Sequence, residues 1–205
     1  MSNMMNDVKR HYDLLIDEGN DPVHDPAPLR AYMDGWDGQC LLDALALDRS
    51  QDVLEIGVGT GRLALRTAPL CRSLTGIDLS EKTIIRAGEN LAGLTNVHLV
   101  CADFMTWDTA QRFDAVYSSL TFLHLPDKRR AAEKVAGLLR PGGRAVLSLD
   151  KSRSAVLDYG TRQLTVYPDD PAALSAHLRG AGLTVLPVQE TEFAHIVTAV
   201  REEEG

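Results

Sequence analysis

The sequence predicts an α/β fold, in which a mostly parallel β-sheet is covered by helices on both faces. Two observations carry this prediction. Short apolar stretches typical of buried strands alternate along the chain with longer stretches of helical periodicity. In addition, residues 52–61 (DVLEIGVGTG) join one such strand to a helix through three closely spaced glycines. Strands that alternate with helices form parallel sheets, because each crossover places a helix on one face of the sheet.

The first part of the chain, residues 1–27, is polar and contains two prolines and several aspartates. We expect a short helix at residues 8–17, followed by an irregular segment that is either mobile or a lid. From Leu29 to residue 45, apolar side chains recur on one helical face, although Gly35 and Gly38 weaken the pattern. This helix is expected to lie against the sheet just before the first strand.

The central part of the chain supplies the parallel strands and their crossovers. Ser80 is a suitable N-cap for a helix that ends near Leu91, and another amphipathic helix follows. The sequence RPGG at 140–143 ends that helix, because proline cannot continue it and glycine permits a reversal. The strands are expected at 53–56, 74–77, 97–101, 113–118 and 145–149, and the helices at 62–70, 80–91 and 127–139.

Residues 151–168 form an insertion after the fifth strand, with an extra strand at 163–167. A helix at 171–180 and strands near 183–189 and 194–200 complete the chain. The last connection is brief, so the final strand is expected to pair antiparallel with its predecessor. Neither internal repeats nor linker-like segments are present, and residues 1–205 are predicted to form a single domain.

The composition limits the class of protein. With 44% hydrophobic and 24% charged residues and no long apolar run, the chain predicts a globular cytoplasmic protein without a signal peptide or membrane span. A net charge of −8 argues against a nucleic-acid partner, because phosphate binding requires a basic surface. Cys40, Cys71 and Cys101 lack the spacing of a metal site, and we expect reduced thiols and no bound metal.

Polar residues and glycines follow the ends of several predicted strands. These are residues 57–61, Asp78, Asp103 and residues 118–119. The carboxyl ends of parallel strands meet at one edge of the sheet, where ligands of such folds bind. A glycine turn that opens a helix also exposes backbone N–H groups and the positive end of the helix dipole. The sequence therefore predicts a nucleotide-type cofactor site at this edge.

The glycine spacing distinguishes between two kinds of cofactor. A dinucleotide fingerprint requires glycine at the sixth position counted from Gly57, and Arg62 occupies that position. The sequence EIGVGTG at 55–61 instead resembles the first motif of class I S-adenosylmethionine-dependent methyltransferases. The similarity extends from about residue 29 to residue 200 through GIDLS at 76–80, CADF at 101–104, FDAV at 113–116 and LLRPGG at 138–143. It implies a Rossmann-like, seven-stranded, mostly parallel sheet with an antiparallel last strand, and S-adenosylmethionine as the cofactor.

The resemblance assigns roles to the glycine turn. Gly57, Gly59 and Gly61 are expected to let the backbone approach the methionine and ribose parts of the cofactor. Glu55 either orders this loop or receives the amino group of the cofactor. The alternative for Glu55 is a local role, as a carboxylate that satisfies neighbouring N–H groups.

It also assigns the residues that follow the next strands. Asp78 is expected to accept hydrogen bonds from both ribose hydroxyls, with Leu79 in the same site; the alternative is a cap for the next helix. Asp103 would accept from the adenine amino group, with Phe104 beside the ring, unless Asp103 only forms a turn. Ser119, together with the residue that follows it, is expected to line the methionine pocket.

Two further polar residues have uncertain roles. Asp114 begins the fourth strand, away from the expected site, and a structural role is at least as plausible as a functional one. His124 lies near the site and either takes a proton from a hydroxyl or amine nucleophile or simply flanks a helix. We therefore leave the catalytic residue unassigned.

The aromatic residues near the N-terminus have two interpretations. Tyr12, Tyr32 and Trp36 are candidates to cover the cofactor, whose sulfonium cation suits an aromatic face. Packing in the core is the favoured alternative for Tyr32 and Trp36. In the insertion, Tyr159 and Arg162 are candidates for acceptor recognition, although plain surface roles are favoured for both.

The predicted function is methyl transfer from S-adenosylmethionine to a small molecule by direct displacement at the methyl carbon. Alignment in a dry pocket supplies much of the rate enhancement, so neither a catalytic triad nor a metal cluster is required. One alternative is a non-catalytic cofactor-binding module that acts through a protein partner, and another is a nicotinamide-dependent oxidoreductase. The acceptor and the oligomeric state do not follow from the sequence.

Overall fold

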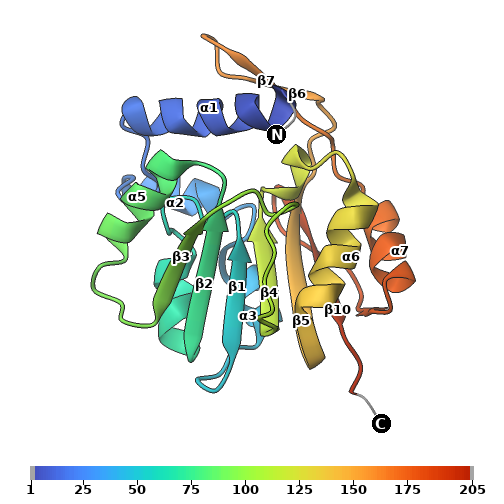
Figure 1. Ribbon diagram of the computed structural model, residues 1–205. Helices are drawn as coiled ribbons and strands as arrows, with labels where there is room; N and C mark the ends of the chain where they lie inside the picture. Colours follow the sequence, from blue (N-terminus) through green and yellow to red (C-terminus); the bar gives the residue numbers. More distant parts are fainter. Residues whose placement is uncertain (1–2, 204–205) are drawn as a thin grey trace.

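The computed structural model describes residues 3–203 and contains one central sheet (Figure 1). Strands β1 to β5 are parallel, whereas β10 runs antiparallel to both β5 and β8. A further two-residue strand, β9 (Gln189–Glu190), also pairs with β10. The strand order is β3 (Val97–Cys101), β2 (Ser73–Asp78), β1 (Asp52–Ile56), β4 (Phe113–Ser119), β5 (Leu139–Asp150), β10 (Ala194–Val200) and β8 (Thr184–Val185). The predicted fold class is confirmed.

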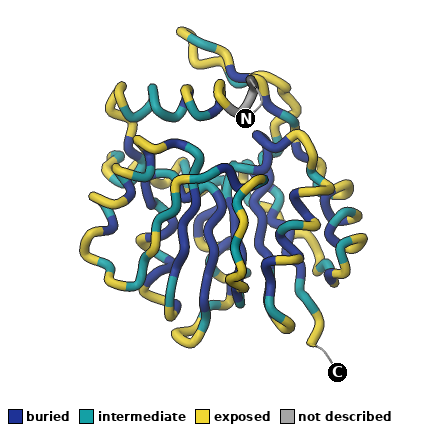
Figure 2. The backbone as a smooth tube through the Cα atoms, viewed as in Figure 1, coloured by how far each residue is buried: buried dark blue, intermediate teal, exposed yellow. Residues whose placement is uncertain are grey.

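The sheet is covered on both faces, and its central strands, β1, β2, β4, β5 and β10, are mostly buried (Figure 2). Alternate side chains of β1 pack on opposite faces of the sheet, because successive side chains of a strand point to opposite sides. Val53 packs in the cluster of buried side chains that includes residues of α3, α4 and α5, whereas Leu54 and Ile56 pack with those of α6 and α7. The helices are α3 (Gly38–Leu45), α4 (Ala64–Thr67), η1 (Ala68–Leu70), α5 (Glu81–Asn90), α6 (Lys128–Leu138) and α7 (Pro171–Gly180). Two-sided burial explains why the strands are continuous apolar runs.

The helix expected between Leu29 and residue 45 is wrong as a single element. The structure has α2 (Ala27–Met33) and α3, separated by a break at residues 34–37. The Asp37 side chain accepts from the backbone N–H of Gly38 and so caps the start of α3. Gly35 lies against Phe193, whose ring would be 2.5 Å from an added Cβ. The two glycines that weaken the sequence pattern therefore mark the real boundary.

Two strands also differ from their predicted lengths. The expected strand at 183–189 is interrupted and forms β8 and β9. Strand β5 begins earlier than expected, at Leu139, and includes the RPGG sequence. Gly142 has a φ of +75° there, and the pairing of β4 with β5 shifts register between Phe113 and Ala115. The glycines thus allow an irregular start to the strand rather than a separate turn.

Helix α1 (Asn3–Asp17) is longer than predicted and crosses above the carboxyl ends of the parallel strands (Figure 1). The insertion forms a hairpin of β6 (Val156–Asp158) and β7 (Gln163–Thr165), separate from the main sheet. Val8 of α1 packs in an apolar cluster with Leu164 and Val166 of the insertion. Helix α1 and the insertion, which are far apart in the sequence, therefore meet above the carboxyl ends of the parallel strands. None of the helices within 3–203 combines the length and apolar character needed to cross a bilayer.

Candidate functional site

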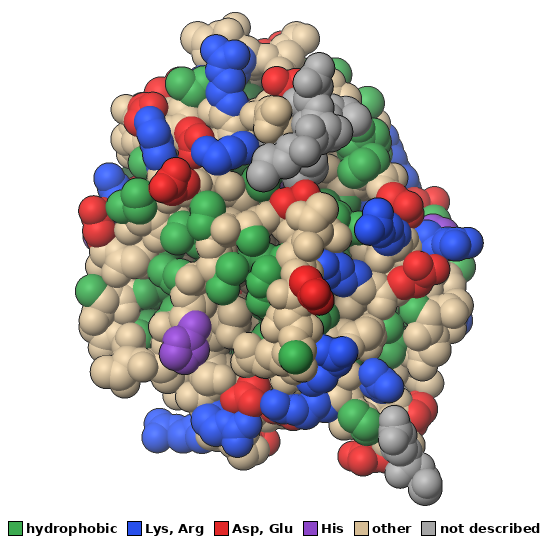
Figure 3. All heavy atoms as spheres, in the orientation of Figure 1, with side chains coloured by type: hydrophobic (Ala, Val, Ile, Leu, Met, Phe, Trp, Pro, Cys, Tyr) green, Lys and Arg blue, Asp and Glu red, His purple; other side chains and the backbone are tan. Residues whose placement is uncertain are grey.

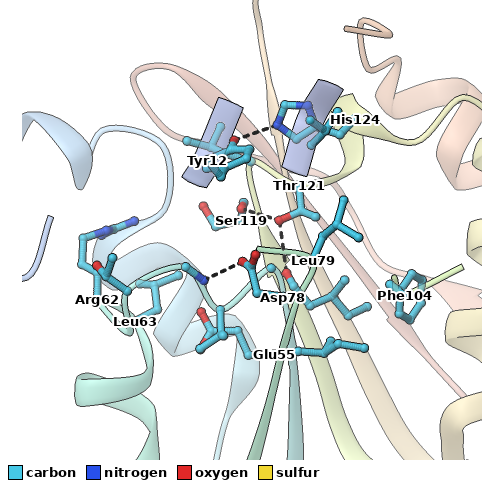
Figure 4. A pocket seen from close by; sticks show the side chains of 18 of the residues that line it. Tyr12, Glu55, Arg62, Leu63, Asp78, Leu79, Phe104, Ser119, Thr121 and His124 are labelled. Atoms are coloured by element: carbon cyan, nitrogen blue, oxygen red, sulfur yellow. Dashed lines mark hydrogen bonds between the residues drawn. The ribbon is translucent and has the colours of Figure 1, made fainter. Parts of the chain in front are cut away.

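A cavity with a volume of about 250 Å³ lies at the carboxyl ends of β1, β2, β3 and β4, beneath α1 (Figure 4). Strand β1 lies between β2 and β4, so the cavity is at the point where the strand order reverses. Eight of the nine predicted site residues line it: Glu55, Gly57, Gly59, Asp78, Leu79, Asp103, Phe104 and Ser119. The exception is Gly61.

The three glycines of the turn have different surroundings. Gly57 has a φ of +75°, and a Cβ there would lie 1.9 Å from Thr121 Oγ1. Gly59 has a φ of +56°, with open space at the Cβ position. Gly61 has a φ of +96° and faces Leu91 of the neighbouring helix, 2.9 Å from an added Cβ. Gly61 therefore allows the loop to pack against Leu91, and it is not among the residues that line the cavity.

Asp78, at the end of β2, is tied to the glycine turn. Its Oδ2 accepts from the backbone N–H of Gly59 at 3.0 Å, and its Oδ1 accepts from that of Ser80 at 2.9 Å. Ser80, rather than Asp78, caps α5, because its hydroxyl accepts from the N–H of Thr83 at 3.1 Å. Burial raises the pKa of the Asp78 carboxyl above its ordinary value, and these backbone hydrogen bonds offset part of the effect.

The residues that follow β3 form another wall of the cavity. Asp103 is buried, and its Oδ1 accepts from the backbone N–H of Met105 at 2.8 Å. This carboxylate thus forms the turn that the alternative interpretation predicted, while it also lines the cavity. Phe104 follows it, and the Lys134 ammonium lies 5.2 Å from the centroid of the Phe104 ring.

Glu55 is the most deeply buried acid of the cavity, with an exposed fraction of 3%. Its Oε2 accepts from the Tyr117 hydroxyl at 2.6 Å, and that hydroxyl lies 2.8 Å from the Thr67 hydroxyl. Burial raises the pKa of Glu55 to about 8, against the lowering effect of the Tyr117 hydrogen bond and of Arg62. The carboxyl group is therefore mainly protonated at neutral pH.

The glycine turn, the two strand-end aspartates and the strand order together define the type of site, and comparison with known proteins agrees. Residues 53–143 match the model of a methyltransferase domain family. An uncharacterized methyltransferase of Mycobacterium tuberculosis is 36% identical over 104 residues, which are 50% of this chain and 52% of that protein. This region is therefore similar to a methyltransferase domain, as the resemblance to class I S-adenosylmethionine-dependent methyltransferases implied. The resemblance of its motifs to that family is confirmed.

Further similar proteins extend the comparison. A ubiquinone biosynthesis O-methyltransferase of Coxiella burnetii is 34% identical over 104 residues, 49% of this chain and 44% of that protein. The chain thus spans about half the length of the curated relatives it matches. Among solved structures, DhpI in complex with SAH has a TM-score of 0.78 and 23% identity, and the alignment covers 100% of both chains. At that identity, the likeness establishes the shared fold.

One wall of this cavity is held by an ion pair that the motifs did not reveal. Arg62 lines the cavity and binds Asp37 through two nitrogens, with Nη1 at 3.1 Å from Oδ1. Asp37 is fully buried and also accepts from the Ser119 hydroxyl at 2.6 Å. The N-terminus of α3, the glycine turn and the end of β4 are thereby connected. The position of Arg62 directly after the glycines was the available sequence signal, whereas nothing marked Asp37.

The cavity is closed on the α1 side by Tyr12 and His124. The Tyr12 hydroxyl lies 2.8 Å from His124 Nε2, and both residues line the cavity (Figure 4). His124 belongs to η2 (Phe122–His124) and is 6% exposed. Burial lowers the pKa of His124 to about 4, helped by His11 and Lys128, and burial also raises the pKa of Tyr12. The histidine is therefore neutral and the tyrosine protonated at neutral pH.

The remaining candidates lie outside the cavity. Tyr32 and Trp36 contact Phe193, with ring centroids 5.2 and 4.6 Å from its ring, but Tyr32 is 52% exposed and does not pack in the core as the alternative predicted. Arg162 donates to Glu18 and to His11 on α1. Tyr159 of the same hairpin stacks on His11, with ring centroids 4.3 Å apart.

Asp114 lies at the other end of the sheet. Its Oδ2 accepts from the backbone N–H of Asp52 at 2.7 Å and from Arg140 at 2.6 Å. These contacts match the structural alternative considered for this residue. Its position at the start of β4 was a sufficient sequence signal, because ligands bind at the opposite ends of parallel strands.

Proposed function

We propose that this chain is an S-adenosylmethionine-dependent methyltransferase that acts on a small-molecule acceptor. The observation that carries the proposal is the convergence of the glycine turn, Asp78 and Asp103 on one cavity at the strand-order reversal. Because the chain spans about half the length of the relatives it matches, their activity supports the proposal without deciding the substrate.

The cavity suits the adenosyl part of the cofactor. Each oxygen of Asp78 accepts one backbone hydrogen bond and can accept a second one, so the carboxylate can receive both ribose hydroxyls. Open space at the Cβ position of Gly59 lets a ligand approach the backbone there. We assign Asp103 to the adenine amino group, and Leu79 and Phe104 to the faces of the ring.

The other side of the glycine turn suits the methionine part. When bound, the cofactor supplies a methyl group activated by a positively charged sulfur. Glu55 lines this region beside Gly57, while Arg62 is paired with Asp37. We propose that Glu55 and the backbone of Gly57 and Ser119 hold the cationic amino acid part. An ammonium group beside Glu55 would favour the ionised carboxylate and lower its pKa.

Helix α1 is proposed as the lid of this site. Val8 and Tyr12 line the cavity from above, and Pro22 and Met33 belong to the segments that follow. The helix is attached to the core by the hydrogen bond from Ser80 to Asp13, at 2.7 Å. A lid that excludes water strengthens the electrostatic contacts inside and aligns the methyl group with its acceptor.

A small-molecule acceptor is supported by the charge of the chain. The net charge is −8, and acidic and basic side chains are interspersed on the face shown in Figure 3. A nucleic acid would require a basic surface. The name of the Coxiella burnetii relative places that protein in ubiquinone biosynthesis. We expect the chain to act in the cytoplasm, where its free cysteines Cys40, Cys71 and Cys101 remain reduced.

The proposal is tested by calorimetric titration of the full chain with S-adenosylmethionine and, separately, with NAD. We expect saturable binding of S-adenosylmethionine and none of NAD. Formation of S-adenosylhomocysteine should then rise when small acceptors are added. Binding without any acceptor-dependent turnover would favour a non-catalytic module, and preferential binding of NAD would contradict the proposal.

A further inference from the structure

At the α1 end of the cavity, two polar side chains are hydrogen-bonded to each other among apolar residues. Tyr12 and His124 lie on the side of Ser119 and Thr121 that faces away from Glu55 (Figure 4). The neighbouring lining residues at this end are Val8, Leu120 and Leu125. Leu120 has a φ of +54°, a left-handed conformation that is unusual for leucine. The strained backbone directly precedes the turn that carries His124, and such strain is common at functional sites.

The pair is uncharged but able to exchange protons. The Tyr12 hydroxyl hydrogen-bonds to His124 Nε2, while His124 Nδ1 is buried without a hydrogen-bond partner among residues 3–203. Burial is the main cause of the lowered pKa of His124, and His11 and Lys128 lower it further. The Lys128 ammonium binds Asp169 at 2.6 Å. A neutral imidazole so placed is a hydrogen-bond acceptor and a base.

The uncharged Tyr12–His124 pair limits the kinds of nucleophile that the cavity suits. An acceptor carboxylate or phosphonate is already ionised and requires a cation, but the lining arginine, Arg62, is bound to Asp34 and Asp37. A neutral amine can attack first and lose its proton later, so it needs no base during transfer. A hydroxyl stays protonated at neutral pH and has to give up its proton as the new bond forms. A buried, uncharged base therefore suits a hydroxyl.

We propose, on the basis of the methyltransferase function above, that the acceptor is a small hydroxyl compound with an apolar body, and that Tyr12 and His124 accept its proton. The hydroxyl oxygen forms the bond to the methyl carbon while the carbon–sulfur bond breaks and its electron pair stays on sulfur. The hydroxyl proton moves to Tyr12 Oη as the tyrosine proton moves to His124 Nε2. Tyr12 is then the catalytic residue that touches the acceptor, and His124 acts through it.

The charge inside the cavity is conserved in this step. The sulfonium loses its positive charge as the imidazole gains one, so the cavity never contains two new cations. Loss of the sulfonium charge also raises the proton affinity of His124 at the moment when the proton is transferred. The proton later leaves to solvent when the lid opens.

The test uses the full chain with S-adenosylmethionine and three matched probes: 4-methylphenol, 4-methylaniline and 4-methylbenzoate. Methylated product is measured by mass spectrometry. We expect methylation of the phenol at the oxygen and little reaction of the other two. Methylation of the aniline or benzoate with an inert phenol, or no reaction of any probe although S-adenosylmethionine binds, would overturn the hydroxyl assignment. Failure of S-adenosylmethionine to bind would instead refute the proposed function.

Variants test the two residues. Tyr12→Phe and His124→Asn should each lower kcat for 4-methylphenol by about 100-fold or more, with less than about a threefold change in the Kd for S-adenosylmethionine. Tyr32→Phe, outside the cavity, serves as the matched control and should leave both values unchanged. Wild-type rates should change little between neutral and alkaline pH, whereas the variants should become faster as the phenol ionises.

A phenol with an acidifying substituent, 4-nitrophenol, completes the test. It is largely ionised in mildly alkaline buffer and needs no base, so the variants should methylate it at close to the wild-type rate. An equal loss of activity toward 4-nitrophenol and 4-methylphenol would show that the pair only shapes the site, and it would overturn the proposal.

Discussion

The two ends of the sheet carry carboxyl groups in opposite electrostatic settings. At the amino end of β1, Asp52 accepts from Arg72 at 2.9 Å and from Arg140 at 2.9 Å, and Asp114 shares Arg140. At the carboxyl end of the same strand, Glu55 accepts a hydrogen bond from the Tyr117 hydroxyl. Arg72, followed by Ser73 and Arg140, holds the pKa of Asp52 well below its usual range, whereas burial raises the pKa of Glu55.

The difference separates structural from functional acids. The paired carboxylates connect β1, β2, β4 and β5 where these strands begin, and arginines already compensate their charge. Glu55 and Asp78 at the cavity are buried with little compensating charge, which lowers the stability of the fold. A cationic ligand would supply that compensation. Locally unfavourable arrangements of this kind are expected at functional sites.

The largest expected effect comes from Glu55. An acid whose folded pKa is raised from 4.5 to about 8 destabilises the fold increasingly as pH rises between those values, because only the unfolded chain releases the proton. The penalty is absent below pH 4.5 and constant above pH 8. Glu55→Gln, which keeps an acceptor for Tyr117, should thus raise the free energy of unfolding by about 3 kcal/mol at pH 7 and less at pH 5. Urea unfolding at both pH values checks this, and an equal effect at both would contradict it.

The next effect concerns binding at Asp78. Asp78→Ala removes a charged acceptor of the ribose hydroxyls, worth about 1.5–3 kcal/mol, which corresponds to a loss of roughly 10- to 150-fold in affinity for S-adenosylmethionine. Asp114→Ala, at the other end of the sheet, should leave the affinity unchanged. Calorimetric titration of both variants makes the comparison. Equal losses in the two would show that the variants act through stability and not through contact.

Substitution of Asp52 should lower the stability of the fold and leave cofactor affinity largely unchanged, the opposite of the result expected for Asp78. Asp52→Asn should lower the free energy of unfolding by about 1–2 kcal/mol, since the side chains of Arg72 and Arg140 are 57% and 36% exposed and solvent weakens the pairs. Because the folded pKa of Asp52 is depressed, this stabilisation is present above its unfolded value near 3.8 and is lost as pH falls below it. Denaturant unfolding at neutral and acidic pH measures both points. A large loss of cofactor affinity would contradict the purely structural role.

The smallest expected effect is a difference in cofactor affinity between variants of two glycines. Gly59 and Gly182 have φ values of +56° and +87°, and both have open space at the Cβ position. Alanine at either position should cost about 1 kcal/mol of stability, because a left-handed backbone is unfavourable for it. Only Gly59→Ala should weaken S-adenosylmethionine binding, by several-fold. Equal affinities of the two variants would argue against backbone contact at Gly59.

Much of this architecture follows from local sequence patterns. Apolar runs defined β1 to β4 within a residue or two, and α7 and β10 at their observed bounds. The N-caps Ser80 and Asp127 are side chains that accept from the start of α5 and α6. Where local signals conflicted, as between Leu29 and residue 45, the pattern predicted the apolar face and missed the break, because a contact with distant Phe193 determines it.

The fold class, the edge of the sheet that carries the site and most of the residues that line it could be predicted from local patterns. These features depend on the period of strands and helices and on glycines at fixed spacing, which are properties of short segments. Three contacts became visible only in the folded chain: Arg62 pairs with Asp37, Gly61 faces Leu91, and Tyr12 meets His124 across 112 positions of the chain. Such contacts join segments whose relative positions are set by packing of the whole domain, so no local pattern contains them.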